Sequence, residues 1–154
     1  MAGLDNLDIL FVVWAFLLQI VLVIHFALRK WRFDVSIHYG PLVYALGIPS
    51  TVVSLILLIG GKSFEFWLAG FLCLIWAIFG YTVDYLKAVQ WRSPIRWPVA
   101  IPYVFLYLAT IMFYWWPLGQ FGRPLWFAYA VLFVVGTWLN ISSHKAPEER
   151  LESA

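Results

Sequence analysis

The chain has 154 residues, of which 64% are hydrophobic, 20% are aromatic and only 12% are charged. Soluble domains are about 45–50% apolar, so this composition excludes an ordinary soluble fold and indicates an integral membrane protein. The formal net charge is only +2, and the cations gather in short connections between apolar runs. Such a basic rim suits anionic lipid headgroups, so we expect membrane lipids as partners and no nucleic acid.

Five apolar runs of about 20 residues are each long enough to cross roughly 30 Å of hydrocarbon as a helix. They cover residues 9–28, 39–59, 64–86, 97–116 and 124–142. The connections are short and leave no room for a soluble domain. We therefore predict an all-α polytopic membrane protein, a single five-transmembrane-helix bundle over residues 1–154, in which residues 143–154 form a short cytoplasmic tail.

The first run is preceded by MAGLDNLD, which carries two aspartates and no Lys or Arg. A secretory signal has a basic start and a shorter apolar core, so we expect this run to remain as a helix. Gln19 lies at its mid-depth and His25 near its end, on faces about 120° apart. At most one of the two is therefore expected to face the bundle centre.

The cations predict the orientation, because Lys and Arg accumulate on the cytoplasmic side of membrane proteins. Only Lys62 and Arg123 fall on one side. The other side carries Arg29, Lys30, Arg32, Lys87, Arg92, Arg96, Lys145 and Arg150. We predict an outside N-terminus and an inside C-terminus, in a plasma or inner membrane.

The connections differ in length. Residues 59–64 (IGGKSF) and 117–124 (PLGQFGRP) predict tight exterior turns between antiparallel neighbours. Ser63 is the expected N-cap of the third helix, with Glu65 in its first turn. Residues 29–38 and 87–96 are the longer, basic interior connections.

Each of the last four runs aligns distinctive residues on one helical face, given about 100° per residue. The face of the second run, bent near Pro49, holds Gly40, Tyr44, Gly47, Thr51 and Ser54. The face of the third run holds Gly70, Cys73, Ala77, Gly80 and Asp84. The face of the fourth run holds Arg96, Tyr103, Tyr107, Thr110 and Tyr114. The face of the fifth run holds Tyr129, Phe133, Gly136, Asn140 and Ser143. Small residues allow close helix approach, so these faces are predicted to point into the bundle.

These faces predict a ligand-binding cavity between the helices, open toward the cytoplasmic side. Its predicted lining is Thr51, Ser54, Asp84, Tyr103, Tyr107, Thr110, Tyr114 and Asn140. At 1.5 Å per residue, His25, Asp84 and Asn140 reach a similar depth to Tyr44 and Tyr103, so these five residues are expected to meet. In this hypothesis Asp84 anchors a cationic or hydrogen-bond-donating group of the ligand or carries a proton, and His25 is its proton partner.

Each of these residues also has a purely structural interpretation. The aligned faces are then packing contacts, and Asp84 pairs with Lys87, Arg92 or Arg96. His25 then marks only the interface, and Asn140 makes interhelical hydrogen bonds. Most tryptophans fit interfacial belts, whereas Trp76 lies at mid-membrane and is the best candidate for ligand stacking.

Several chemistries are excluded because the sequence lacks the residues or motifs that they need. The single cysteine, Cys73, allows no intrachain disulfide and no CxxC site, and there is no HExxH, GxSxG or P-loop. No lysine lies deep enough in a run for a retinal Schiff base, and two embedded histidines for a haem are missing. We assign no catalytic residue and no metal, and the cofactor stays unknown: an axial His25 bond to a pigment or haem is the one arrangement left open.

The best-supported hypothesis is binding or transport of a small, largely apolar or aromatic molecule in this cavity. A second is a non-catalytic transmembrane subunit, in a homo-oligomer or in a larger membrane complex that handles pigment or redox groups. A third is a lipid-modifying enzyme that uses Asp84 and His25. The binding hypothesis predicts a central cavity faced by Asp84 and the tyrosines. The subunit hypothesis predicts a filled interior and a strip of small residues that faces lipid. The enzyme hypothesis predicts hydrogen bonding between Asp84 and His25.

Overall fold

The computed structural model describes residues 4–92 and 94–143, and five helical segments of this part are long and apolar enough to cross a membrane. Two of them are composite: α2 with α3, and α4 with the π-helix η1. The elements are α1 (Asn6–Trp31), α2 (Phe33–Ala45), α3 (Gly47–Ile59), α4 (Phe64–Tyr81), η1 (Thr82–Leu86), α5 (Trp97–Phe121) and α6 (Arg123–Ser142). The predicted all-helical architecture with five membrane-length helices is confirmed, whereas the orientation stays a prediction. Apart from Ser143, the predicted tail lies outside the described residues.

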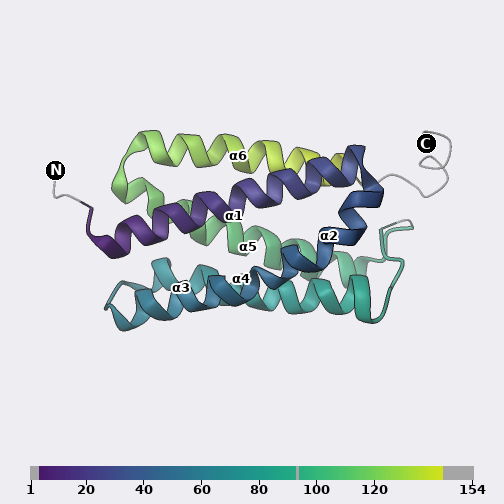
Figure 1. Ribbon diagram of the computed structural model, residues 1–154, viewed down its shortest axis with the longest axis horizontal. Coiled ribbons are helices and arrows are strands. Elements are labelled where there is room, and N and C mark those ends of the chain that lie inside the picture. The colour runs from purple at the N-terminus through teal and green to yellow at the C-terminus, as the bar shows by residue number, and fades with distance from the viewer. Residues whose placement is uncertain (1–3, 93, 144–154) are drawn as a thin grey trace.

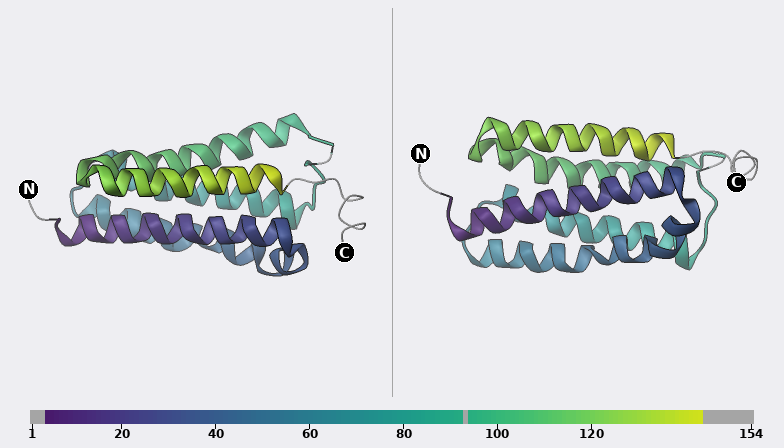
Figure 2. Two further views of the ribbon diagram at one scale, coloured as in Figure 1. Left: turned by 90° about the horizontal axis from the view of Figure 1, so that it is seen from above. Right: turned by 45° about the horizontal axis from the view of Figure 1, so that its top comes forward.

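The helices lie side by side along one axis (Figures 1 and 2). α4 packs between α3 and α5, and α1 packs against α6 and α2. We call the end of the bundle where residues 60–63 and Gly122 reverse the chain the turn end. The opposite end, with Arg32 and residues 87–96, is the loop end. The turn-end connections join the contacting pairs α3–α4 and α5–α6, as predicted.

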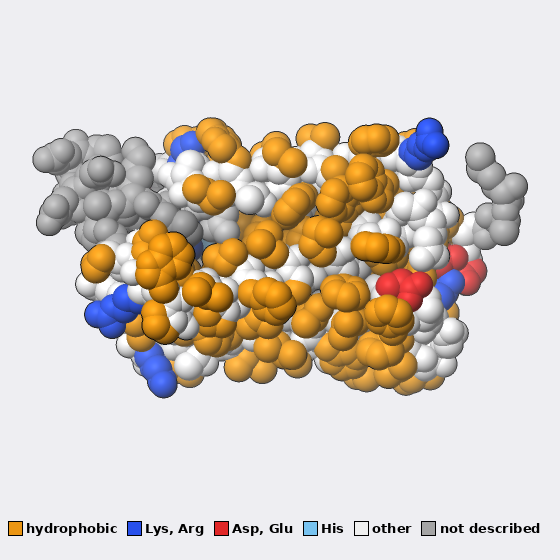
Figure 3. Space-filling model, turned by 180° about the vertical axis from the view of Figure 1, so that it is seen from behind, with side chains coloured by type: hydrophobic (Ala, Val, Ile, Leu, Met, Phe, Trp, Pro, Cys, Tyr) orange, Lys and Arg blue, Asp and Glu red, His pale blue; other side chains and the backbone are white. Residues whose placement is uncertain are grey.

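The side surface of the bundle is apolar over most of its length. Figure 3 shows hydrophobic side chains spread along it, with Lys, Arg, Asp and Glu gathered at the two ends. Large residues such as Ile48, Phe105 and Ile141 are each more than 60% exposed there. Because water would oppose such exposure, this surface is consistent with an integral membrane protein surrounded by lipid.

The second span starts earlier than predicted and is broken in the middle. Residues 33–38 were expected in a connection, but they form the first part of α2, and only Arg32 separates α2 from α1. Leu46 then interrupts the helix between α2 and α3. Pro49 explains this break, because it has no N–H to donate to the carbonyl of Ala45 and its ring crowds that carbonyl. The break agrees with the predicted bend at Pro49.

The second exterior turn is shorter than predicted. α5 continues to Phe121, and Gly122 alone joins it to α6. Gly122 has a φ of 137°, a conformation that favours glycine because it carries no Cβ. At the other exterior turn Ser63 occupies the N-cap position of α4, but its side chain makes no capping hydrogen bond. Lys62 instead ties this turn to the start of α1 by pairing with Asp5, at 2.8 Å, and with Asp8.

The small-residue face of the third span points into the bundle, as predicted. Gly70, Cys73, Ala77 and Gly80 are all buried. At the closest approach the Gly70 N–H donates to Ser54 Oγ at 3.1 Å. A Cβ on Gly70 would overlap this hydroxyl and the backbone carbonyl of Ser50, so α3 and α4 can be this close only with glycine at position 70.

Gln19 is the residue of the first span that faces the centre. Its side chain is fully buried, and its Nε2 donates to the Leu132 carbonyl at 3.2 Å. The Tyr129 hydroxyl donates to Gln19 Oε1 at 3.5 Å. His25 lies on another face, toward the loop end, so the two residues occupy different environments, in agreement with the predicted angle between them.

We expect Gly70→Ala to destabilise the bundle, although alanine is the better helix former. The new methyl group would push α4 away from the Ser50 backbone, and overpacking of this kind costs about 1–3 kcal/mol. Heat- or detergent-induced unfolding of the purified protein measures the loss. Gly119→Ala is the matched control, because its Cβ would meet only the movable Trp126 ring. Equal stability of the two variants would contradict the close α3–α4 contact.

Candidate functional site

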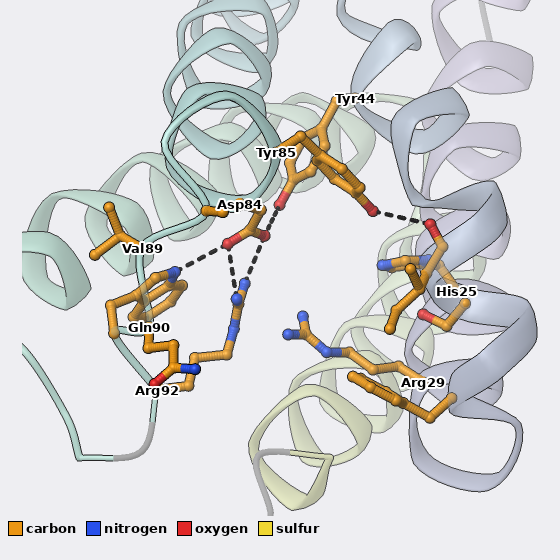
Figure 4. Close-up of a pocket in the computed structure, with 13 residues that line it drawn as sticks. His25, Arg29, Tyr44, Asp84, Tyr85, Val89, Gln90 and Arg92 are labelled. Atoms are coloured by element: carbon orange, nitrogen blue, oxygen red, sulfur yellow. Dashed lines mark hydrogen bonds and ion pairs between the residues drawn. The ribbon is translucent and has the colours of Figure 1, made fainter. Parts of the chain in front are cut away.

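A cavity of about 390 Å³ lies at the loop end, between the ends of α1 and α2, η1 and the connection that follows. Its volume is in the range of small-molecule sites. Figure 4 shows the charged residues converging on it from opposite walls. The lining residues are His25, Arg29, Phe33, Ser36, Ile37, Tyr44, Asp84, Tyr85, Ala88, Val89, Gln90, Trp91 and Arg92.

Asp84 is the centre of one wall and has four hydrogen-bond donors. Arg92 binds it through both terminal nitrogens, with Nη1 2.7 Å from Oδ1 and Nη2 2.8 Å from Oδ2. Trp91 Nε1 donates to Oδ1 at 2.9 Å, and the Tyr44 hydroxyl donates to Oδ2 at 2.6 Å. The carboxylate is only 13% exposed and the guanidinium side chain 15%. This is a bidentate ion pair, the strongest arrangement of these two groups.

The chain reverses sharply after Asp84, which brings Arg92 back over it. The last turn of the third span is the π-helix η1, a form that is often found at functional sites. The Val89 N–H then donates to the Val83 carbonyl at 2.9 Å, and Ala88 has a positive φ of 43°. A non-glycine residue at such a φ is strained, so the surrounding contacts must hold this turn in place.

Aromatic rings support the Asp84 wall from behind. The hydroxyls of Tyr44 and Tyr103 are 3.2 Å apart, which links α2 to α5. The Trp91 ring lies 4.9 Å from the Tyr103 ring, and the Arg92 guanidinium lies 4.0 Å from the Trp91 ring centre. Stacking on an aromatic face suits the planar guanidinium. Arg92 is therefore held both by the carboxylate and by the ring.

The electrostatic balance keeps Arg92 charged. Burial alone would lower the pKa of its guanidinium, but the hydrogen bonds and the negative charge of Asp84 outweigh burial. The pKa of Arg92 therefore lies above its ordinary value. Arg92 is therefore held in its charged form, the form that pairs with Asp84.

The opposite wall carries Arg29 and His25, one helical turn apart on α1. Figure 4 shows the Arg29 guanidinium directed toward the Asp84–Arg92 pair. Among the described residues, Arg29 has no ion pair and its side chain has no hydrogen bond. Both residues are half-buried. The pocket therefore holds two guanidinium groups and one carboxylate.

The predicted ligand residues fall into two groups. Asp84 and the predicted proton partner His25 line the pocket, and Tyr103 lies behind it through Tyr44. The other six do not line it: Thr51, Ser54, Tyr107, Thr110, Tyr114 and Asn140. Of the five residues expected to meet, Tyr44, Tyr103 and Asp84 are joined by hydrogen bonds, and Asn140 is not at the pocket.

The deeper predicted residues make local contacts. Thr51 and Thr110 donate to backbone carbonyls of their own helices, at 2.8 Å each, and Ser54 accepts from Gly70. The hydroxyls of Tyr107 and Tyr114 are buried without a hydrogen-bond partner among the described residues. The role of these side chains as ligand contacts stays a prediction. Trp76 is also buried and touches the rings of Tyr44, Tyr103 and Tyr107, with centroids 5.4–5.9 Å away.

Two charged residues of the pocket were not predicted as ligand contacts from the sequence. Arg29 was counted only as a cation that sets orientation, although it lies four residues after His25 and therefore on the same helical face. Arg92 was named as one of three candidate partners of Asp84, and the ion pair with Arg92 is the one that forms. The position of Arg92 depends on how the chain returns at the loop end, which periodicity does not describe.

The three functional hypotheses are met only in part. The cavity is at one end of the bundle rather than central, and its wall includes Asp84 but not Tyr107 or Tyr114. The small-residue face is buried, whereas the subunit hypothesis expects such a strip toward lipid. Within the described part of the chain no direct hydrogen bond joins Asp84 to His25. The enzyme hypothesis also allows a contact through water, and that contact stays a prediction.

Comparison with known proteins does not assign the chain to a family. No protein-family model, no curated protein and no solved structure matches the chain. Function is therefore inferred from the pocket and its charges.

We expect Asp84→Asn and Arg92→Gln each to lower the free energy of unfolding by about 2–4 kcal/mol, because each leaves the partner buried and unpaired. The double variant should lose clearly less than the sum of the two, with a coupling of about 1–3 kcal/mol. Unfolding of the three variants in one mild detergent measures this cycle. Arg96→Gln removes the same charge from the same connection at an exposed position and should change stability by less than about 0.5 kcal/mol. Additive losses would contradict the pairing.

Proposed function

We propose that this protein binds a small amphipathic molecule in the loop-end pocket. The observation that carries the proposal is one cavity of ligand size, lined by a few charged residues among apolar and aromatic side chains, within a bundle of membrane-length helices. Few, well-placed polar groups on a mainly apolar lining are typical of small-molecule sites. The polar group of the ligand would lie near Arg29 and Arg92, and its apolar part against Phe33 and Ile37.

The location of the pocket supports an amphipathic ligand whichever way the protein is oriented. Either end of a membrane-spanning bundle lies where hydrocarbon meets water. Ile37 lines the pocket and is also 52% exposed, so an apolar side chain of the pocket reaches the surface of the bundle. A molecule with a polar head and an apolar body has its lowest free energy at this depth.

The rim of the pocket is closed on one side by Tyr85. Its hydroxyl donates to the Ile37 carbonyl at 3.3 Å and so joins η1 to α2. Tyr85 also packs against Tyr44, with ring centroids 6.1 Å apart. These contacts give the ligand an aromatic wall and a fixed pocket shape, which favours binding because less order must be imposed on the protein.

Asp84 acts in this proposal as a positioning residue and not as the anchor for a ligand cation. Its two oxygens already accept hydrogen bonds from Arg92, Trp91 and Tyr44. The carboxylate therefore orients Arg92 at the wall of the pocket. We propose binding rather than passage through the bundle, because Tyr107, Ile111 and Tyr114 fill the core beyond the pocket.

We expect wild-type protein purified in a mild detergent to retain a bound small molecule, detected by native mass spectrometry and by analysis of an organic extract. Ile37→Trp should lower its occupancy about tenfold, because the larger ring enters the pocket. Leu42→Trp is the matched control: it makes a similar change on the same helix, at an exposed position outside the pocket lining. Equal occupancy in the two variants would refute the proposed site.

A further inference from the structure

We infer that the polar group of the ligand is a phosphate, held between Arg29 and Arg92. This inference rests on the proposed function and names the class of molecule that the pocket takes, a phosphate-bearing amphiphile. Three features of the pocket support it: its charge, its unused hydrogen-bond donors and the way its two arginines are held.

The charges in the pocket do not balance. Arg29 and Arg92 line it together, and Asp84 is the only carboxylate among the lining residues. Asp84 is fully engaged with Arg92. One positive charge therefore remains, on Arg29, in a half-buried position where a charge without a counter-ion costs free energy. An anion between the two guanidinium groups would offset this cost.

The unused donors favour phosphate over a carboxylate. A guanidinium presents a planar fork of N–H groups that matches two oxygens of one anion. The whole Arg29 fork is without a partner among the described residues. Arg92 keeps a further buried donor, its Nε, which has no partner within residues 4–92 and 94–143. A carboxylate has only two oxygens for both arginines, whereas a phosphate has enough acceptors to face each of them.

The two arginines are held differently, and this suits a binding site. Arg92 is fixed by the Asp84 carboxylate and by the Trp91 ring, so it needs little ordering when a ligand arrives. Arg29 extends from α1, on the opposite wall (Figure 4). Gln90 also lines the pocket and offers an amide donor. The arrangement is a preformed wall and a facing cation, which together surround an anion.

The phosphate could belong to a membrane lipid or to a soluble compound, and competition separates these sources. Binding of dioctanoyl phosphatidic acid to the purified protein is measured by calorimetry in a neutral detergent. Inorganic phosphate is added as competitor, and octanoate is the carboxylate comparison. Displacement by inorganic phosphate at millimolar concentration assigns the site to soluble phosphate compounds, and resistance to displacement assigns it to the lipid.

We expect Arg29→Gln to weaken binding of phosphatidic acid about tenfold or more, since it removes a charge-assisted contact. Arg29→Lys, which keeps the charge but loses the fork, should bind with intermediate affinity and guards against a folding defect in the first variant. Arg32→Gln removes the same charge at the same end from an exposed side chain and should bind like wild type.

Unchanged affinity of Arg29→Gln for phosphatidic acid would overturn the phosphate assignment. Octanoate binding that is as tight as that of phosphatidic acid, and equally dependent on Arg29, would overturn it too. The proposed function would still stand if Arg29→Gln kept a co-purified molecule that Ile37→Trp loses. If neither wild type nor Leu42→Trp carries any small molecule, the proposed function fails as well. The two experiments therefore separate failure of the ligand class from failure of the site.

Discussion

The Asp84–Arg92 ion pair is the interaction on which the loop end depends. Removing a carboxylate and a guanidinium from water costs several kcal/mol for each ion, and only good geometry and further hydrogen bonds offset this cost. Here both are present, since Trp91 and Tyr44 add donors to the bidentate pair. Through Tyr44 and Tyr103 the pair also connects η1, α2 and α5. The same network forms one wall of the pocket, to which Tyr44, Asp84, Trp91 and Arg92 all contribute.

The same pair decides the chemistry of the pocket. A lone Asp84 would make the site a receptor for cations, but its pairing with Arg92 neutralises it and leaves the charge of Arg29 in excess. The sign of the site therefore follows from which residues pair, and not from the single acidic residue that stands out in the third span. This is why the proposed ligand carries an anionic group, although the sequence first suggested an anchor for a donor or a cation.

Much of the fold could be predicted because lipid imposes simple rules. Helices must be about 20 apolar residues long, and small residues mark the faces where they touch, as Gly70 and Gly80 do. The predictions failed where the path of the chain is decided by local geometry. The early start of α2, the π-helix after Tyr81 and the positive φ of Ala88 leave no periodic signal. Arg92 reaches the pocket through the π-helix and the turn at Ala88, so its position opposite Arg29 could not be predicted.

The tyrosines of α5 show why a polar stripe does not by itself make a cavity. Their hydroxyls indicated binding groups at the sequence level, yet each ring also fills a large volume. Tyr107 packs against Phe26 and Trp76, with centroids 5.8 and 5.9 Å away, and Tyr114 packs against Phe11 at 6.0 Å. Ring packing thus fills the middle of the bundle and leaves the two hydroxyls without partners among the described residues. The pocket, and with it the proposed binding site, lies instead at the loop end, where Asp84, Arg92 and Trp91 form one wall.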